Sequence, residues 1–171
     1  MKKSYLFLMV FSLGFLFISC SNSKPDAKEA AKYNNVIIEQ QILIAETIDD
    51  LDEAFYLEHE LLPYYEKAVN QVNSSIKKIE ELENFGKGKY LDNTFKEAAL
   101  KFAFELKAVL ENEYKLLIEY DALLTEEFDE ELEDKLYDIY FLIDDLFSEI
   151  STSFLESQSK FAEKYGFVLE D

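Results

Sequence analysis

Arginine and tryptophan are absent from this chain of 171 residues, and histidine and cysteine each occur once. Without arginine, the chain has no guanidinium group to bind phosphate or carboxylate in a bidentate manner. The single histidine, His59, excludes the paired Glu-x-x-His motifs of di-metal helical bundles and leaves no credible Ser/His/Asp triad. The sequence therefore predicts no metal site, no cofactor and no enzymatic activity.

Glycine and proline are also scarce, at four and two residues, although turns depend on these residue types. Hydrophobic residues make up 49% of the chain, which is too many for a generally disordered protein. A chain with few turn residues and a large apolar content favours long, uninterrupted helices. The sequence therefore predicts an all-α protein, and its length corresponds to one domain.

Negative charge dominates, with 36 acidic residues against 17 basic ones and a net charge of −19 at pH 7. Such a surface repels nucleic-acid backbones and anionic lipid headgroups. We therefore expect no nucleic-acid partner, and any contact with a membrane requires a different means of attachment.

The first 20 residues contain a candidate for that attachment. Lys2 and Lys3 precede an apolar run over residues 4–18, which is shorter than the roughly 20 residues that a membrane-spanning helix needs. The run ends in LFISC at residues 16–20 and changes abruptly to a polar stretch, 21–25. This segment resembles the signal peptide and lipobox of bacterial lipoproteins, with Phe17 at a position usually held by leucine.

The resemblance implies cleavage before Cys20, acylation of its thiol and amine, for example with palmitate, and anchorage at a membrane. Residues 1–19 would then be a cleaved signal peptide, 20–25 a lipidated tether and 26–171 a helical bundle domain. Ser21 at the second position is compatible with sorting to the outer membrane, and the face of that membrane stays open. A plain secretory signal or an uncleaved anchor is the alternative, but the former needs no cysteine and the latter needs a longer apolar run.

Beyond the tether, apolar residues recur at alternating steps of four and three along four stretches, as on one face of a helix. The first stretch begins at Asp26, a suitable N-cap, and the second follows Pro63. The third begins near Thr94, and the fourth extends from the acidic stretch 126–134 to Gly166. Because short connections favour antiparallel neighbours, we predict an antiparallel, up-down-up-down four-helix bundle of long helices.

Pro63 allows two interpretations. A tight reversal around residues 60–62 would place the proline in the first turn of the second helix, where it is tolerated. The apolar pattern also stays in phase across the proline, through Leu62, Tyr65 and Val69, which would suit one long kinked helix. The reversal is favoured, because a proline inside a helix is costly.

A second resemblance covers most of the region after the signal segment. It lies in the runs 33–35, 98–100, 109–114 and 164–167, with isolated matches at Gln41, Phe154, Gln158 and Phe161. These features resemble an uncharacterised family of helical lipoproteins and surface proteins of Bacteroidota and spirochaetes. The resemblance implies a helical fold and a location at the cell envelope, and it implies no activity.

Polar residues within the apolar pattern are the candidate binding residues. Glu113 is the acidic residue on the seam of the third stretch, with Tyr120 farther along that seam, and Asn34 and Gln41 lie on the seam of the first. Glu113, Gln41 and Tyr120 would form a polar pocket for a small ligand or cation. The favoured alternative is a polar layer that fixes the helix register, or a glutamate that reaches the surface.

Two further clusters have a functional and a structural interpretation. The acidic stretch 126–134 could bind Ca²⁺, but it lacks the pattern of a calcium loop and suits a helix start better. The surplus aromatic residues, among them Tyr137, Tyr140 and Phe141, suit either a contact surface for a partner or a wide core. We therefore expect a lipid-anchored, non-catalytic interaction or structural module with a protein partner in the envelope; the alternative is a small-ligand or cation-binding lipoprotein.

Overall fold

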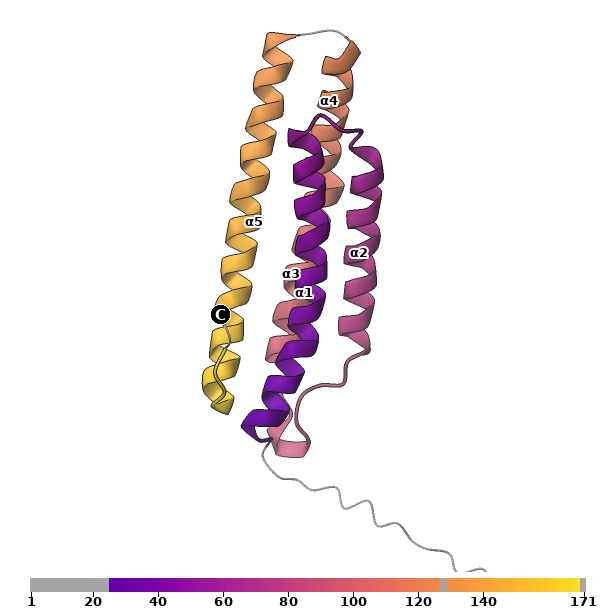
Figure 1. Ribbon diagram of the computed structural model, residues 1–171. Helices are drawn as coiled ribbons and strands as arrows, with labels where there is room; N and C mark the ends of the chain where they lie inside the picture. The colour runs from indigo at the N-terminus through magenta and orange to yellow at the C-terminus, as the bar shows by residue number, and fades with distance from the viewer. Residues whose placement is uncertain (1–24, 127–128, 170–171) are drawn as a thin grey trace, which may run out of the picture.

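The computed structural model describes residues 25–126 and 129–169, and the described part is an all-helical bundle (Figure 1). Cys20 and the segment that resembles a signal peptide lie outside these residues. The elements in chain order are α1 (Ala27–Tyr56), α2 (Leu62–Glu81), η1 (Gly88–Tyr90), α3 (Thr94–Val109), η2 (Leu110–Tyr114), α4 (Lys115–Glu126) and α5 (Glu130–Tyr165). Because α3, η2 and α4 follow one another without a break, they form one helical column, and the described residues form four such columns.

The helix ends agree with the local sequence signals. Asp26 and Glu29 form a reciprocal capping box at the start of α1, in which the Asp26 side chain accepts the Glu29 N–H at 2.8 Å. Gly166 ends α5 in the left-handed conformation, with φ of 74°. Gly86 has φ of 77°, and a Cβ atom there would lie 2.2 Å from the carbonyl oxygen of Tyr90, so only glycine fits this turn.

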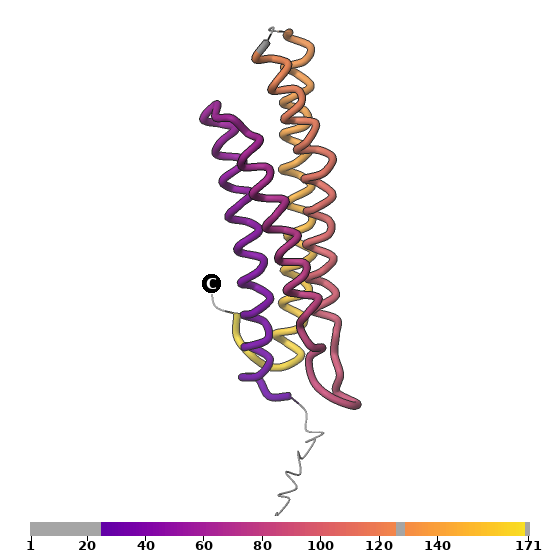
Figure 2. The backbone as a smooth tube through the Cα atoms, turned by 90° about the vertical axis from the view of Figure 1, so that its right-hand side faces the viewer, coloured from indigo at the N-terminus to yellow at the C-terminus, as the bar shows by residue number. Residues whose placement is uncertain are grey.

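Pro63 lies in the first turn of α2, and the five residues 57–61 separate α2 from the end of α1. The reversal is therefore confirmed, and the single kinked helix is wrong. α1 and α2 lie side by side from this turn downward (Figure 1). The column of α3, η2 and α4, together with α5, continues past the turn, so the second pair of helices is longer than the first (Figure 2).

The core lies where the four columns meet. Its largest fully buried side chains are spread over three of them, and they are mostly aliphatic: Ile37, Ile44, Leu51, Val72, Phe95, Leu106, Leu110 and Leu117. Burial of such apolar surface contributes about 25 cal/mol per Å² and is the main term that holds the columns together. At the end of the bundle where α1 begins and α5 ends, the core is aromatic instead, and rings from α1, α3 and α5 surround Phe161.

The seam predicted for the third column is fully buried only as far as Val109. Steps of three and four from Val109 lead through Glu113 to Leu116, Tyr120 and Leu123; Tyr120 packs against the core, but the two leucines are 37% and 51% exposed. The residues that directly follow these two leucines face the core instead: Leu117 is buried in it, and Leu124 packs against it. The buried face has therefore moved by one position.

The π-helical turn η2 causes this displacement. A π turn contains one residue more than an α turn, so every residue after it is rotated by one position around the helix axis. Tyr114, only 2% exposed, occupies the buried position that the sequence pattern assigned to Glu113. Glu113 is therefore displaced to the edge of the seam, where it is partly exposed, in agreement with the favoured alternative of a glutamate that reaches the surface.

No helix in residues 25–126 or 129–169 combines the length and the apolar content that are needed to cross a membrane.

Candidate functional site

The three residues predicted to form a ligand pocket are not assembled into one. Glu113 lines a pocket between the third column and α5, and neither Gln41 nor Tyr120 is part of its lining. Gln41 is partly buried on α1, and Tyr120 is a partly buried residue of α4 that packs against the core. The predicted site therefore reduces to Glu113 and its neighbours.

The glutamine that enters the core is Gln40, which is 5% exposed. Ser75 on α2 donates its hydroxyl hydrogen to the Gln40 side-chain oxygen at 3.3 Å. Asn34 is buried as predicted, and its side-chain oxygen accepts a hydrogen bond from Gln158 on α5 at 3.1 Å. Both pairs satisfy buried polar groups between columns, which is the register-fixing role that was favoured for Asn34.

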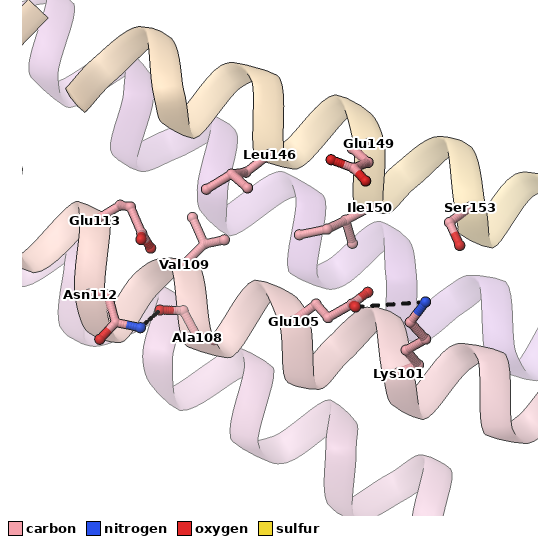
Figure 3. A pocket seen from close by; sticks show the side chains of 10 residues that line it. All are labelled: Lys101, Glu105, Ala108, Val109, Asn112, Glu113, Leu146, Glu149, Ile150 and Ser153. Carbon is pink, nitrogen blue, oxygen red and sulfur yellow. Dashed lines mark hydrogen bonds and ion pairs between the residues drawn. The ribbon is translucent and has the colours of Figure 1, made fainter. Parts of the chain in front are cut away.

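The Glu113 pocket has a volume of about 360 Å³ and lies between α3, η2 and α5 (Figure 3). Val109 and Ile150 supply apolar surface, and carboxylates of Glu105 and Glu149 reach the same space. Lys101 pairs with Glu105 at 3.7 Å. The pocket therefore combines an apolar floor with carboxylates, which suits a small cationic or polar molecule better than an anion.

A second pocket, of about 170 Å³, lies on the other side of η2, between α1 and α5. Its centre is the hydrogen bond from the Tyr114 hydroxyl to the Asp52 carboxylate, at 2.7 Å. Tyr140 and the carboxylates of Asp49 and Asp144 also line it, together with the apolar side chains of Ile48, Ile143 and Phe147. The π turn is what directs Tyr114 to this position, and π turns are frequent at functional sites.

The titration behaviour of this pair is set by burial. Burial raises the pKa of Asp52 most; the hydrogen bond from Tyr114 lowers it, and the carboxylates of Asp49 and Asp144 raise it further. Burial also raises the pKa of Tyr114, followed by the charge of Asp52. Tyr114 therefore keeps its proton near neutral pH and acts as a hydrogen-bond donor to Asp52.

Replacing Asp52 with asparagine should stabilise the protein at pH 7. Because the pKa of Asp52 is raised in the folded state, the charged form opposes folding at every pH above that pKa, whereas asparagine stays neutral and still accepts the Tyr114 hydrogen bond. Urea denaturation should give a higher free energy of unfolding for Asp52→Asn at pH 7 and no difference at pH 3. Glu53→Gln, on an exposed neighbour, is the matched control. A lower stability of Asp52→Asn at pH 7 would contradict the conclusion that the charged Asp52 carboxylate opposes folding.

Asp92 is the centre of a third polar cluster, which the sequence did not reveal. Its side chain is 3% exposed and accepts hydrogen bonds from Lys164 at 2.6 Å and from the Tyr165 hydroxyl at 2.9 Å. Thr94 donates its backbone N–H and its hydroxyl to the other carboxylate oxygen. The backbone of Asp92 also pairs with that of Phe85. The cluster therefore fastens the loop between α2 and α3 to the end of α5.

Asp92→Ala should lower the free energy of unfolding by about 2–3 kcal/mol at pH 7, because it removes a buried carboxylate that accepts hydrogen bonds from Lys164, Tyr165 and Thr94. Burial alone would raise the pKa of Asp92, but the hydrogen bonds from Lys164, Thr94 and Tyr165 outweigh it and lower the pKa to about 2. A lowered carboxylate pKa contributes stability above the unfolded value of 3.8, and this contribution is lost as the pH falls toward 2.

The measurement for Asp92 is therefore denaturation at several pH values between 7 and 2. The difference between wild type and Asp92→Ala should be largest at pH 7 and should shrink below pH 4. Glu163→Ala, on an exposed residue of α5, should have little effect at any pH. A pH-independent difference would show that the carboxylate charge does not carry the contribution.

The acidic stretch 126–134 includes the start of α5, as the favoured interpretation predicted. Asp129 caps the helix by accepting the N–H groups of Glu131 and Leu132 at 2.9 and 3.2 Å, and residues 127–128 lie outside the described part. Acidic side chains fill the first turn, where the helix dipole favours them. Among the described residues, no three His, Cys, Asp or Glu side chains are grouped as a metal ion requires.

Comparison with protein-family models, with curated proteins and with solved structures finds no match for this chain.

Proposed function

We propose that this protein is a lipid-anchored component of a bacterial cell envelope whose domain, residues 26–171, is a non-catalytic interaction or structural module. The signal-like segment and Cys20 support the anchor, with the outer membrane as its site. We further propose that the domain is an antiparallel, up-down-up-down four-helix bundle of long helices. Packing between columns that are consecutive in the chain supports this arrangement.

The observation that carries the interaction function is an open groove at the end of the bundle where α1 turns into α2. The groove has a volume of about 970 Å³, and Leu62 and Tyr137 in its lining are 50% and 49% exposed. We name it the end groove; its walls are the α1–α2 turn, α4 and α5. An exposed apolar surface of this kind, framed by polar residues, is typical of a protein–protein contact.

The position of the end groove suits an anchored protein. α1 begins at Ala27, and its 30 residues span about 45 Å, so the groove lies at the opposite end of the bundle from the tether. A lipid on Cys20 would hold the first turn of α1 near the membrane and the end groove away from it.

The anchor is tested by Cys20→Ser in cells that produce the protein. Wild type should incorporate labelled palmitate and remain with the membrane fraction, whereas Cys20→Ser should do neither. Chemical cross-linking in the same cells should then yield one dominant protein partner for the wild type. Absence of the lipid label on the wild type would overturn the anchor, and absence of any specific partner would overturn the interaction function.

The Glu113 pocket supports a second function, the binding of a small ligand or cation. Its volume of about 360 Å³ lies within the range of small-molecule sites, and it contains three carboxylates. A ligand at 100 times its Kd adds about 2.7 kcal/mol to the stability of the folded state. A diamine should therefore raise the melting temperature of wild type but not of Glu113→Gln; equal melting temperatures of wild type with and without the diamine would exclude this function for that compound.

A further inference from the structure

The end groove has an apolar floor at the level of the α1–α2 turn. Leu61 and Leu136, 4% and 6% exposed, form part of this floor, and Phe55 joins them from the last turn of α1. Above the floor, α4 and α5 continue without α1 and α2 between them (Figures 1 and 2). Leu62, at the start of α2, and Tyr137, on α5, line this space, and both side chains are half exposed.

Carboxylates dominate the charged groups of the groove, whose lining also includes the imidazole of His59. Four of its lining residues are acidic, namely Glu58, Glu60, Asp121 and Glu133, and its lining contains no lysine. The like charges oppose one another across the space: burial raises the pKa of Asp121, and the carboxylate of Glu58 raises it further. A positively charged occupant would relieve this repulsion and would replace it with attraction.

This charge pattern excludes several classes of occupant. A second copy of the chain would bring the same acidic rim and a net charge of −19 against the groove. Nucleic acid and anionic lipid would be repelled for the same reason. What fits is a surface with apolar side chains in its centre and basic side chains at its margins.

We propose that the end groove binds a basic, amphipathic helical segment of a partner protein. The apolar face of that helix would cover Leu62 and Tyr137, and its lysine or arginine side chains would pair with Asp121 and Glu133. This inference rests on the proposed interaction function and specifies the chemistry of the partner. The mode is that of an amphipathic helix bound in a hydrophobic groove, with anchors spaced three and four residues apart.

The test uses the purified full-length chain and a fluorescent peptide of about 18 residues, roughly five helical turns, made only of leucine and lysine. Leucine lies at the positions of one helix face, and a scrambled peptide of the same composition has no such face. Fluorescence anisotropy should show that the amphipathic peptide binds at least tenfold more tightly than the scrambled one. Equal affinity of the two peptides would overturn the proposal, because charge alone would then explain the binding.

A matched pair of variants locates the binding surface. Leu62→Ala with Tyr137→Ala should weaken binding of the amphipathic peptide at least tenfold. Ile42→Ala with Leu155→Ala, both 51% exposed and outside the groove lining, should leave binding unchanged. All four side chains are about half exposed, so their truncation should not unfold the protein. Melting temperatures equal to that of wild type would confirm that both variants fold.

A second pair separates the groove charges from the general negative charge of the surface. Asp121→Lys with Glu133→Lys should remove most of the binding, whereas Glu156→Lys with Glu163→Lys, on exposed positions of α5, changes the net charge equally and should have little effect. Equal losses of peptide affinity in both pairs of variants would overturn the end groove as the binding site.

Photo-cross-linking in cells distinguishes a failure of the end groove as the binding site from a failure of the proposed interaction function. A photo-reactive residue at position 137 should capture the cellular partner, and one at position 155 should not. Capture at position 155 alone would overturn the end groove and would leave the interaction function standing. Absence of the partner from both positions, together with its absence from chemical cross-linking, would overturn the interaction function itself.

Discussion

Phe161→Ala should lower the free energy of unfolding by about 3–5 kcal/mol, which is a large fraction of the stability of a domain of this size. Phe161 is 3% exposed, and its ring lies within 6.1 Å of five other rings, centroid to centroid. These rings belong to Tyr33, Phe85, Phe95, Tyr165 and Phe167. They come from α1, α3, the end of α5 and the segments that flank these helices, so one substitution would open a cavity among all of them.

The control for Phe161→Ala removes the same atoms from the same helix. Phe141 is 64% exposed, and Phe141→Ala should change the stability by no more than about 0.5 kcal/mol. Urea denaturation followed by circular dichroism measures both variants. Similar losses for the two variants would show that the aromatic cluster around Phe161 does not carry the stability of the aromatic end of the bundle.

Deletion of Glu113 should leave the fold intact, although deletion of one residue from a buried helix normally destroys its packing. The π turn of η2 contains one residue more than an α turn, so removing one residue allows a regular α-helix through this region. Tyr114 and Leu117 would then keep their buried positions. We expect the melting temperature of the Glu113 deletion to stay within a few degrees of wild type, since 1 kcal/mol corresponds to about 2–4 °C for a chain of this size.

Deletion of Glu105, in the regular part of α3, is the matched comparison. It would rotate Leu106 and Val109 out of their buried positions, because the extra residue of η2 lies beyond them and can restore the register only farther along the helix. We expect this variant to lose its cooperative thermal transition. A Glu113 deletion that unfolds like the Glu105 deletion would show that the π turn is needed for the fold rather than accommodated by it.

The residues that mark helix ends were the most informative part of the sequence. Asp26, Pro63 and Gly166 each act through local backbone geometry, so their meaning does not depend on distant contacts. The all-helical class followed from the scarcity of turn residues, and the structure confirms it.

The candidate site was harder to predict, because it depends on features that leave no local signal. η2 consists of ordinary helix-forming residues, so nothing in its composition indicates the extra residue that moves Glu113 aside and brings Tyr114 into contact with Asp52. Gln40 and Gln41 both fit steps of three and four along α1, so spacing alone could not decide between them. Lys164 is 72 positions from Asp92, and only the folded chain brings the two together.

The unequal lengths of the two helix pairs have a consequence for how the molecule opens. α4 packs chiefly on α5, whereas α3 packs on α2, α5 and α1. The backbone amides of α4 and α5 near the end groove are therefore protected by fewer interfaces than the amides of α3. Local opening of α4 and α5 near the end groove should therefore cost less free energy than global unfolding. In hydrogen–deuterium exchange, amides in residues 121–126 and 130–136 should exchange before those in 95–109. We therefore expect the walls of the end groove to open more readily than the aromatic end, and the proposed helical partner would bind where opening of the bundle costs least.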